Sequence, residues 1–354
     1  MTGCGNPARP AMRDTADATR SRHQRTPRAK IAGAHAFGLS RAQRPQPIRN
    51  LTLRKDQMRP APISLAYPPD AARAPVAPFK TQLLKWVGSK QKVAAEIVAQ
   101  FPPRFGAYHE PFLGAAGVMA TLAPNEGYGS DNFAPLIEIW QTLKEDPERL
   151  KHWYSTRWQA FVSGDRSAAY ARIRAAYNAR PNGADFLFLT RSCYGGVVRF
   201  RKADGHMSTP VGAHPPIPPA AFARRVDLWR ARLAGCRFDR LDFAEAMARA
   251  RPGDLVYCDP PYAHSQTILY GAQGFSLPAL MTAIADCRAR GVHVALSIDG
   301  SKKSGRQTCD IDLPQGLFKR ELFVTVGRSM LRRFQTGGQS GEAEVVRDRL
   351  LLTY

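Results

Sequence analysis

From about residue 83 onward, short apolar runs alternate with segments in which apolar residues recur at helical spacing. The run Leu255–Cys258 stops at an acid followed by two prolines, so it predicts a short buried strand. Strands are also expected at 108–110, 127–130, 292–298, 321–326 and 345–354, and helices at 93–101, from about 115, at 135–144 and at 277–290. Strands that alternate with helices are typical of an open α/β sheet.

Residues 151–251 interrupt this alternation. Aromatic and apolar residues at helical spacing predict a small helical subdomain with its own core, formed by Trp153, Trp158, Phe161, Tyr170, Ile173 and Tyr177. Val197–Arg201 and Met207–Pro210 flank a turn and predict a two-stranded ribbon. We therefore expect one main domain from residues 79–150 and 252–354, with residues 151–251 inserted into it.

Residues 1–78 are rich in Arg, Ala and Pro and show little periodic hydrophobicity. Such a segment buries too little apolar surface to offset the entropy of ordering, so we expect a disordered basic extension. Three interpretations stay open for it: an arm on nucleic acid, an organelle transit peptide, or a dispensable extension.

The charge balance indicates a polyanionic partner. The chain has 51 Lys and Arg against 29 Asp and Glu, a net charge of +22. Much of this excess falls in residues 1–78 and 154–251, whereas 79–153 and 252–354 are close to neutral. This asymmetry suggests chemistry in the main domain and electrostatic docking through the insert.

The six cysteines form no close pair and no zinc-binding spacing. We therefore expect a reduced cytoplasmic protein without a structural metal. No apolar run is long enough for a membrane span, and the N-terminus lacks the apolar core of a secretory signal.

The turn after the strand at 255–258 carries the most specific candidate chemistry. Asp259, Pro260, Pro261 and Tyr262 would lie on a stiff turn at the strand's carboxyl end, where open α/β sheets bind ligands. Asp259 and a prolyl carbonyl can accept the two N–H groups of a ring-borne amino group, and Tyr262 can stack on the ring. An ordinary turn is the alternative interpretation.

Residues 79–150 have the pattern of a cofactor-binding half. A strand ending at Glu110 is followed by a turn through Gly114 and a helix start, which form the usual cradle for a nucleoside-like cofactor. Asp131 follows about twenty residues later, where an acid takes the ribose hydroxyls in dinucleotide-type folds. Trp86 and Lys90 flank a Gly-Ser turn and bring an aromatic ring and a cation to one loop.

Four motifs in this order, LKWVGSK, HEPFLGAAG, SDN and DPPY, resemble the DNA adenine methylase family. The resemblance covers about residues 83–354. It implies a Rossmann-like S-adenosylmethionine-dependent methyltransferase sheet, with an inserted, mostly helical DNA-recognition subdomain that carries a β-hairpin. It also implies that the cofactor is lined by Trp86, Lys90, Phe112, Gly114, Asp131 and Asp259. Ala116 stands where the family has a glycine, and its side chain would crowd a close backbone approach or a positive φ.

The segment 197–210 resembles the recognition hairpin of the family. Arg191, Arg199, Arg201 and Lys202 would then reach phosphates or a guanine edge, and Tyr194 would wedge or stack at a base step. The family often has Asn after this aromatic residue, where this chain has Gly195, so no target sequence is transferred from relatives.

The resemblance implies transfer of a methyl group to the exocyclic amino group of adenine in duplex DNA, after base flipping and without a metal. We expect a monomer that associates with the nucleoid through DNA, and leave open whether a cognate restriction enzyme exists. Two alternatives remain: an amino methyltransferase acting on cytosine or on RNA guanine, and a DNA-binding protein without activity on a decayed methylase fold.

Overall fold

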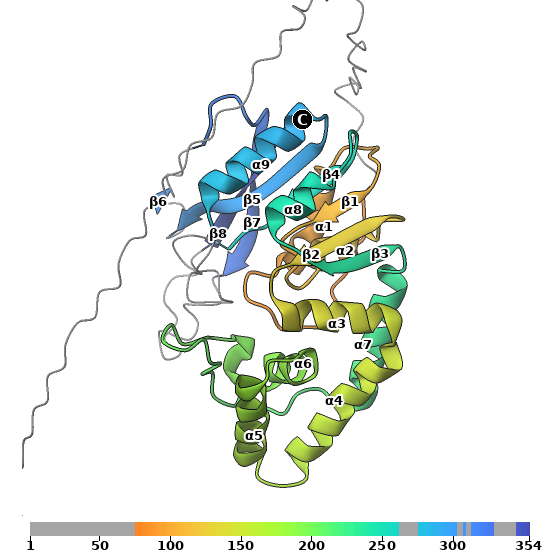
Figure 1. The fold of residues 1–354 in the computed structure, drawn as a ribbon, viewed down its shortest axis with the longest axis vertical. Helices are drawn as coiled ribbons and strands as arrows, with labels where there is room; N and C mark the ends of the chain where they lie inside the picture. Colours follow the sequence, from red (N-terminus) through yellow and green to blue (C-terminus); the bar gives the residue numbers. More distant parts are fainter. Residues whose placement is uncertain (1–74, 262–274, 303–306, 309–312, 329–344) are drawn as a thin grey trace, which may run out of the picture. The chain divides into compact units, whose positions relative to one another are not determined.

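The computed structural model describes residues 75–261, 275–302, 307–308, 313–328 and 345–354 (Figure 1). All of these residues belong to one compact unit, Ala66–Tyr354. Nearly all of the segment 1–78, for which we expect disorder, lies outside the described residues.

The described strands form one eight-stranded sheet. Its main path runs β3-β2-β1-β4-β5-β8-β7, and β6 pairs with β5. The five neighbouring strands β3, β2, β1, β4 and β5 are parallel, whereas β8 is antiparallel to both β5 and β7. The strands are β1 (Tyr108–Glu110), β2 (Gly127–Asp131), β3 (Cys236–Arg240), β4 (Leu255–Cys258), β5 (His293–Lys302), β6 (Gln307–Thr308), β7 (Arg320–Arg328) and β8 (Val345–Leu352). The expected α/β fold with a mostly parallel sheet is confirmed.

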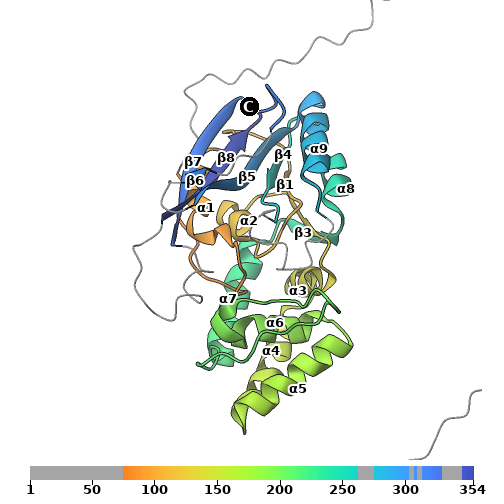
Figure 2. The same cartoon turned by 90° about the vertical axis from the view of Figure 1, so that its left-hand side faces the viewer.

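Helices cover both faces of this sheet (Figure 2). The helices are η1 (Lys90–Lys92), α1 (Ala94–Val98), α2 (Gly117–Leu122), α3 (Ala134–Glu145), α4 (Pro147–Val162), α5 (Arg166–Ala179), α6 (Gly183–Ser192), η2 (Tyr194–Gly196), α7 (Pro219–Arg232), α8 (Phe243–Ala248) and α9 (Leu277–Ala289). No helix among the described residues has the length and apolar character needed to span a bilayer.

Two hydrophobic cores lie on opposite faces of the sheet because strand side chains alternate. In β4, Leu255 and Tyr257 join the core under α1 and α2, whereas Val256 and Cys258 join the core under α8 and α9. A strand buried on both faces has no polar alternation, which is why this segment is a continuous apolar run.

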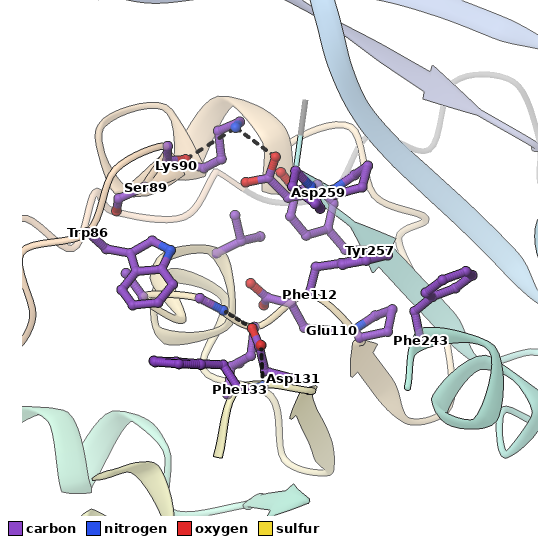
Figure 3. Close-up of a pocket in the computed structure, with 18 of the residues that line it drawn as sticks. Trp86, Ser89, Lys90, Glu110, Phe112, Asp131, Phe133, Phe243, Tyr257 and Asp259 are labelled. Carbon is purple, nitrogen blue, oxygen red and sulfur yellow. Dashed lines mark hydrogen bonds and ion pairs between the residues drawn. The ribbon is translucent and has the colours of Figure 1, made fainter. Parts of the chain in front are cut away.

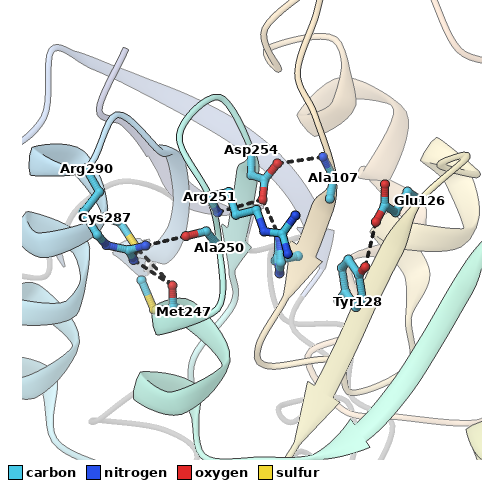
Figure 4. Close-up of polar contacts among 10 residues, drawn as sticks. Ala107, Glu126, Tyr128, Met247, Ala250, Arg251, Asp254, Cys287 and Arg290 are labelled. Carbon is cyan, nitrogen blue, oxygen red and sulfur yellow. Dashed lines mark hydrogen bonds and ion pairs between the residues drawn. The ribbon is translucent and has the colours of Figure 1, made fainter. Parts of the chain in front are cut away.

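The amino ends of the central strands are tied together by Asp254 (Figure 4). Its Oδ1 accepts the N–H of Ala107 at 2.8 Å, and its Oδ2 accepts the N–H of Arg251 at 2.8 Å. On the same side of the molecule, Arg290 at the end of α9 donates to the carbonyls of Met247 in α8 and of Ala250 just after it. These bonds hold the sheet at the edge opposite to the carboxyl ends of its strands.

The helical region differs from the sequence prediction in two respects. The strand Cys236–Arg240 and helix α8 belong to the sheet domain, so the boundary expected at residue 251 is corrected to before β3. The aromatic residues of α4 to α7 do not form a separate core. They are continuous with the core under α1 and α2, as where Tyr154 stacks on Phe222 with ring centroids 4.0 Å apart.

The segment expected to form a ribbon has antiparallel backbone bonds but little regular ladder. The N–H of Arg201 donates to the carbonyl of His206 at 2.9 Å, and that of Ser208 donates to Arg199 at 2.9 Å. Only single bridges are formed, Phe200 with Met207 and, nearer the base, Cys193 with Val211. The ladder stops because the Thr209 hydroxyl takes the place of a backbone partner and accepts the N–H of Arg199 at 2.8 Å.

Candidate active site

A pocket lies at the carboxyl ends of β1, β2 and β4 (Figure 3). From β1 the chain continues through α2 to β2 on one side, and from β4 through α9 to β5 on the other. The connections therefore diverge between β1 and β4, and open α/β sheets bind ligands at such a switch point. The pocket walls come from the loop 86–90, the turn 110–115, the segment 131–133, the segment 241–243 and the residues after β4.

Asp259 stands at the end of β4 and is paired with a buried lysine. The Nζ of Lys90 lies 2.7 Å from Oδ1 of Asp259 and also donates to the carbonyl of Gly88 at 3.2 Å. Burial alone would lower the pKa of Lys90, but the carboxylates of Asp259 and Asp348 raise it above its usual value. Lys90 is therefore an ammonium at neutral pH, and its positive charge lies beside the Asp259 carboxyl group.

The loop before η1 brings Trp86 over the turn at Gly114. Gly88 has φ 79°, and the Ser89 hydroxyl caps η1 by accepting the N–H of Gln91. Gly114 itself has φ 46°, and a β-carbon there would come within 2.9 Å of the indole nitrogen of Trp86. The backbone and the indole thus approach each other more closely than any side chain at 114 would permit.

Asp131 holds the other side of the same turn. Its Oδ2 accepts the N–H of Gly114 at 3.2 Å, and its Oδ1 accepts the N–H of Phe133 at 3.1 Å. Burial raises the pKa of Asp131 to about 6, although its backbone hydrogen bonds oppose that shift. At pH 7 the carboxylate is mostly ionised and is an acceptor at the rim of the pocket.

Glu110 is a pocket residue to which the sequence analysis gave no role. It ends β1, is buried, and its Oε2 accepts a hydrogen bond from the Tyr108 hydroxyl at 2.9 Å. Burial is the main cause that raises the pKa of Glu110 to about 8. The side chain is therefore largely a neutral acid at pH 7. Glu110 could have been identified from the sequence, because it is an acid at the end of a buried strand and comes just before a glycine turn.

Phe112 belongs to an apolar wall that was only partly predicted. Its ring stacks on Phe243 with centroids 5.3 Å apart and meets Phe275 edge-on at 5.9 Å. Phe243 and Phe275 come from segments more than 130 residues further along the chain. No local pattern links them to the pocket, so they could not be predicted from the sequence.

Ala116 has the positive φ that its position in the motif suggested. It lies at φ 51° before α2 and is fully buried, but its neighbours rather than its own side chain line the pocket. Gly117, the glycine that comes one residue later, packs against η1, where a β-carbon would meet the Gln91 backbone at 3.0 Å. Ala116 at this motif position therefore strains the backbone beside the pocket and does not crowd the pocket itself.

Pro260 and Pro261 line the pocket beside Asp259, whereas the predicted stacking residue Tyr262 lies outside the described residues. Of the predicted DNA-binding residues, Tyr194 is 48% exposed, and Arg199 and Lys202 are exposed.

Arg201 pairs with Asp204 across the turn at the end of the ribbon and remains on the surface.

Arg191 is placed differently from its prediction as a DNA contact. Its guanidinium is partly buried, donates to the carbonyls of Gln82 and Leu83, and lies over the ring of Phe222. Burial also lowers the pKa of Arg191. This arginine therefore joins the segment before Trp86 to the helical region, and we no longer count it among the DNA contacts.

The chain is similar to known proteins over the segment that forms the pocket. The family model of the D12 class of N6 adenine-specific DNA methyltransferases matches residues 86–298. The chain is 26% identical over 243 residues to the DNA N-6-adenine-methyltransferase of Escherichia phage P1, an alignment that covers 64% of this chain and 31% of the phage protein. The chain therefore spans about a third of that relative's length.

Two further relatives are covered more fully. Identity to the DNA adenine methylase of Vibrio cholerae is 28% over 227 residues, covering 60% of this chain and 79% of that protein. Identity to the retron Ec67 DNA adenine methylase of Escherichia coli is 30% over 188 residues, covering 51% and 63%. Because the family model matches more than half of the chain and includes every wall of the pocket, the chain belongs to the D12 class of N6 adenine-specific DNA methyltransferases.

Proposed function

We propose that this protein transfers the methyl group of S-adenosylmethionine to N6 of an adenine that has been flipped out of duplex DNA. The observation that carries the proposal is the Lys90–Asp259 pair, with Nζ and Oδ1 2.7 Å apart. The ammonium holds the Asp259 carboxyl group at the end of β4, in the pocket whose other side is the Gly114 turn and Asp131.

The pocket residues fit this cofactor. The Gly114 turn lacks a β-carbon under Trp86, Asp131 can accept from ribose hydroxyls, and Phe112 supplies an apolar wall. When bound, S-adenosylmethionine supplies an electrophilic methyl group on a sulfonium sulfur. The role of the chain is to place the acceptor nitrogen in line with that group and to exclude water.

Asp259 and the backbone after it would accept hydrogen bonds from the adenine amino group. The lone pair of that nitrogen is delocalised into the ring and is a weak nucleophile. Asp259 accepts one N–H and the Pro260 carbonyl accepts the other, which favours a pyramidal nitrogen with its lone pair toward the methyl group. Tyr262 would stack on the flipped base and replace the stacking lost from the duplex.

The helical region and its ribbon are proposed as the DNA-recognition subdomain. Exposed Arg199 and Lys202 would contact phosphates, and Arg201 would do so after releasing Asp204. Tyr194 is exposed beside Gly195 and Gly196, which have φ 64° and 67°, so its ring is carried on a tight turn. A ring presented in this way is suited to insertion at a base step while the target base is flipped.

Incorporation of labelled methyl groups from S-adenosylmethionine tests this function. Unmethylated duplex DNA, the same strands separated, and duplex RNA are compared as acceptors at equal nucleotide concentration. The proposal expects incorporation into duplex DNA to exceed the other two. Preferred labelling of RNA would instead support an RNA amino methyltransferase. Binding of both S-adenosylmethionine and DNA without any transfer would support a DNA-binding protein on a decayed fold.

We also propose that the monomer is the active form and acts in the cytoplasm on the nucleoid. Sedimentation of the full chain, alone and with one duplex, tests the first part, because a dimer on DNA would contradict it. Whether a restriction enzyme accompanies the protein is tested by cleavage of unmethylated DNA in host extracts.

A further inference from the structure

A buried carboxylate reaches the active site from the last strand of the sheet. Asp348 lies on β8 and is 5% exposed. Leu350 and Leu352, two and four residues later, belong to the core under α1 and α2, whereas Leu351 belongs to the opposite core. Strand alternation therefore places Asp348 on the face where Lys90 lies. The proposed function gives this acid no role.

Lys90 connects Asp348 to Asp259. Its Nζ lies 3.5 Å from Oδ2 of Asp348 and 2.7 Å from Oδ1 of Asp259, and it donates to the Gly88 carbonyl at 3.2 Å. The side chains of Lys90, Asp348 and Asp259 are 4%, 6% and 18% exposed. An ammonium has three N–H donors, and three segments of the chain supply acceptors around it. One positive charge is thus shared by two carboxylates.

We propose that Asp348 is a positioning residue for the acceptor carboxylate Asp259, and that it acts through Lys90. The inference rests on the proposed function. Asp348 also attracts the ammonium, so the charge of Lys90 is shared between the two carboxylates and its attraction to Asp259 is weaker than it would be for a simple pair. Without Asp348, the ammonium would bind Asp259 more strongly, in competition with the substrate amino group.

The shared charge also affects the proton that the reaction releases. The N6 lone pair forms the N–C bond to the methyl carbon while the S–C bond breaks and leaves its electron pair on sulfur. N6 then carries one proton in excess, which passes to Asp259. A lysine paired with Asp259 alone would make that carboxylate a weaker base than a lysine shared with Asp348. Asp348 thus keeps Asp259 able to accept the proton.

A purely structural role for Asp348 is the competing explanation, because a buried ion pair that loses one partner also costs stability. The two explanations differ in their dependence on Lys90. A positioning role has no effect once Lys90 is neutral, whereas a packing role of Asp348 persists. The double variant removes the ammonium and one of its two carboxylates, and its kcat is compared with that of Lys90→Gln, in which Asp259 has likewise lost the lysine.

The test measures kcat and KM for methyl transfer by the full chain carrying Asp348→Asn, Lys90→Gln or both. We expect Asp348→Asn to lower kcat on the order of tenfold, equivalent to one charge-assisted hydrogen bond, with both KM values nearly unchanged. In the Lys90→Gln background the same substitution should change kcat less than about twofold. Asp348→Glu should restore most of the lost kcat, because it returns the second carboxylate.

Glu321→Gln is the matched control. Glu321 lies on β7 and pairs with Arg349 of β8 at 2.6 Å, so its loss removes a carboxylate from the same hairpin without touching Lys90. Its kcat should equal that of the wild type. Unchanged kcat in Asp348→Asn, or an equal loss in both Lys90 backgrounds, would overturn the inference while the wild type remains active. A wild type without methyl transfer overturns the proposed function and the inference together.

Discussion

The indole of Trp86 closes over Gly114 so tightly that a β-carbon at position 114 would lie 2.9 Å from the indole nitrogen. The two residues come from separate motifs, and Asp131 holds the Gly114 turn from the other side. The close approach defines one wall of the pocket.

Gly114→Ala should therefore weaken S-adenosylmethionine binding by at least about tenfold, because it forces Trp86 outward and strains a backbone with φ 46°. Isothermal titration calorimetry measures the affinity. Gly164→Ala is the control, since a β-carbon there meets nothing within 4 Å. Equal affinities in the two variants would show that this wall does not contact the cofactor.

Ala116→Gly should stabilise the protein by about 1 kcal/mol, since Ala116 has φ 51° and a left-handed conformation is costly for a residue with a β-carbon. Urea unfolding gives the free energy. Ala120→Gly, inside α2, should instead destabilise by about 1 kcal/mol. A loss of stability in both variants would contradict the strain assigned to Ala116.

Glu110→Gln should change the pH dependence of stability. The pKa of Glu110 is about 8 in the folded protein, above its unfolded value, so its contribution is full below pH 4.5 and is lost as pH rises through about 8. Between pH 6 and 9 the wild type should lose roughly 2–3 kcal/mol more than the variant, whose amide does not titrate. Parallel stability curves over this range would show that Glu110 is ionised at neutral pH.

Lys202→Ala and Arg191→Ala should impair different properties, DNA binding in the first variant and stability in the second. Lys202 is exposed, so its loss should weaken binding to all DNA sequences alike. The number of counterions released on binding, given by the salt dependence of the affinity, should fall by about one, with stability unchanged. Arg191 bonds the carbonyls of Gln82 and Leu83, so its loss should destabilise the fold by roughly 2 kcal/mol or more. Fluorescence anisotropy at several salt concentrations, with thermal unfolding, separates the two effects. Normal stability of Arg191→Ala would return this residue to the candidate DNA contacts.

Asp259→Ala should abolish methyl transfer, because the amino group loses its acceptor, while DNA affinity changes little. Transfer is followed with labelled cofactor, and DNA binding by anisotropy on the same preparation. Retained turnover in this variant would exclude Asp259 as the acceptor.

The central strand could be predicted because its sequence left few alternatives. Leu255–Cys258 is apolar on both faces and is followed by prolines that cannot continue a ladder, so the strand and its end were predicted to the residue. The strand Cys236–Arg240 was missed for the opposite reason. It is an edge strand of the sheet, and charges at Arg237, Asp239 and Arg240 conceal its apolar face.

The site could be predicted where a motif concentrates its residues, as around Gly114, but not where distant segments meet. Asp348 reaches Lys90 from a strand more than 250 residues away, and nothing in the sequence around either residue indicates the contact. The inward position of Arg191 likewise depends on carbonyls 108 and 109 residues earlier in the chain.

Mass analysis of nucleosides from treated DNA tests whether the protein methylates adenine and whether Asp259 is needed for the transfer. Unmethylated genomic DNA is incubated with the full chain and S-adenosylmethionine, digested, and compared with the same DNA treated with Asp259→Ala. We expect N6-methyladenine in the wild-type sample and none in the variant. Methylcytosine in place of methyladenine, or no methylated nucleoside although the folded protein binds both DNA and cofactor, would contradict it.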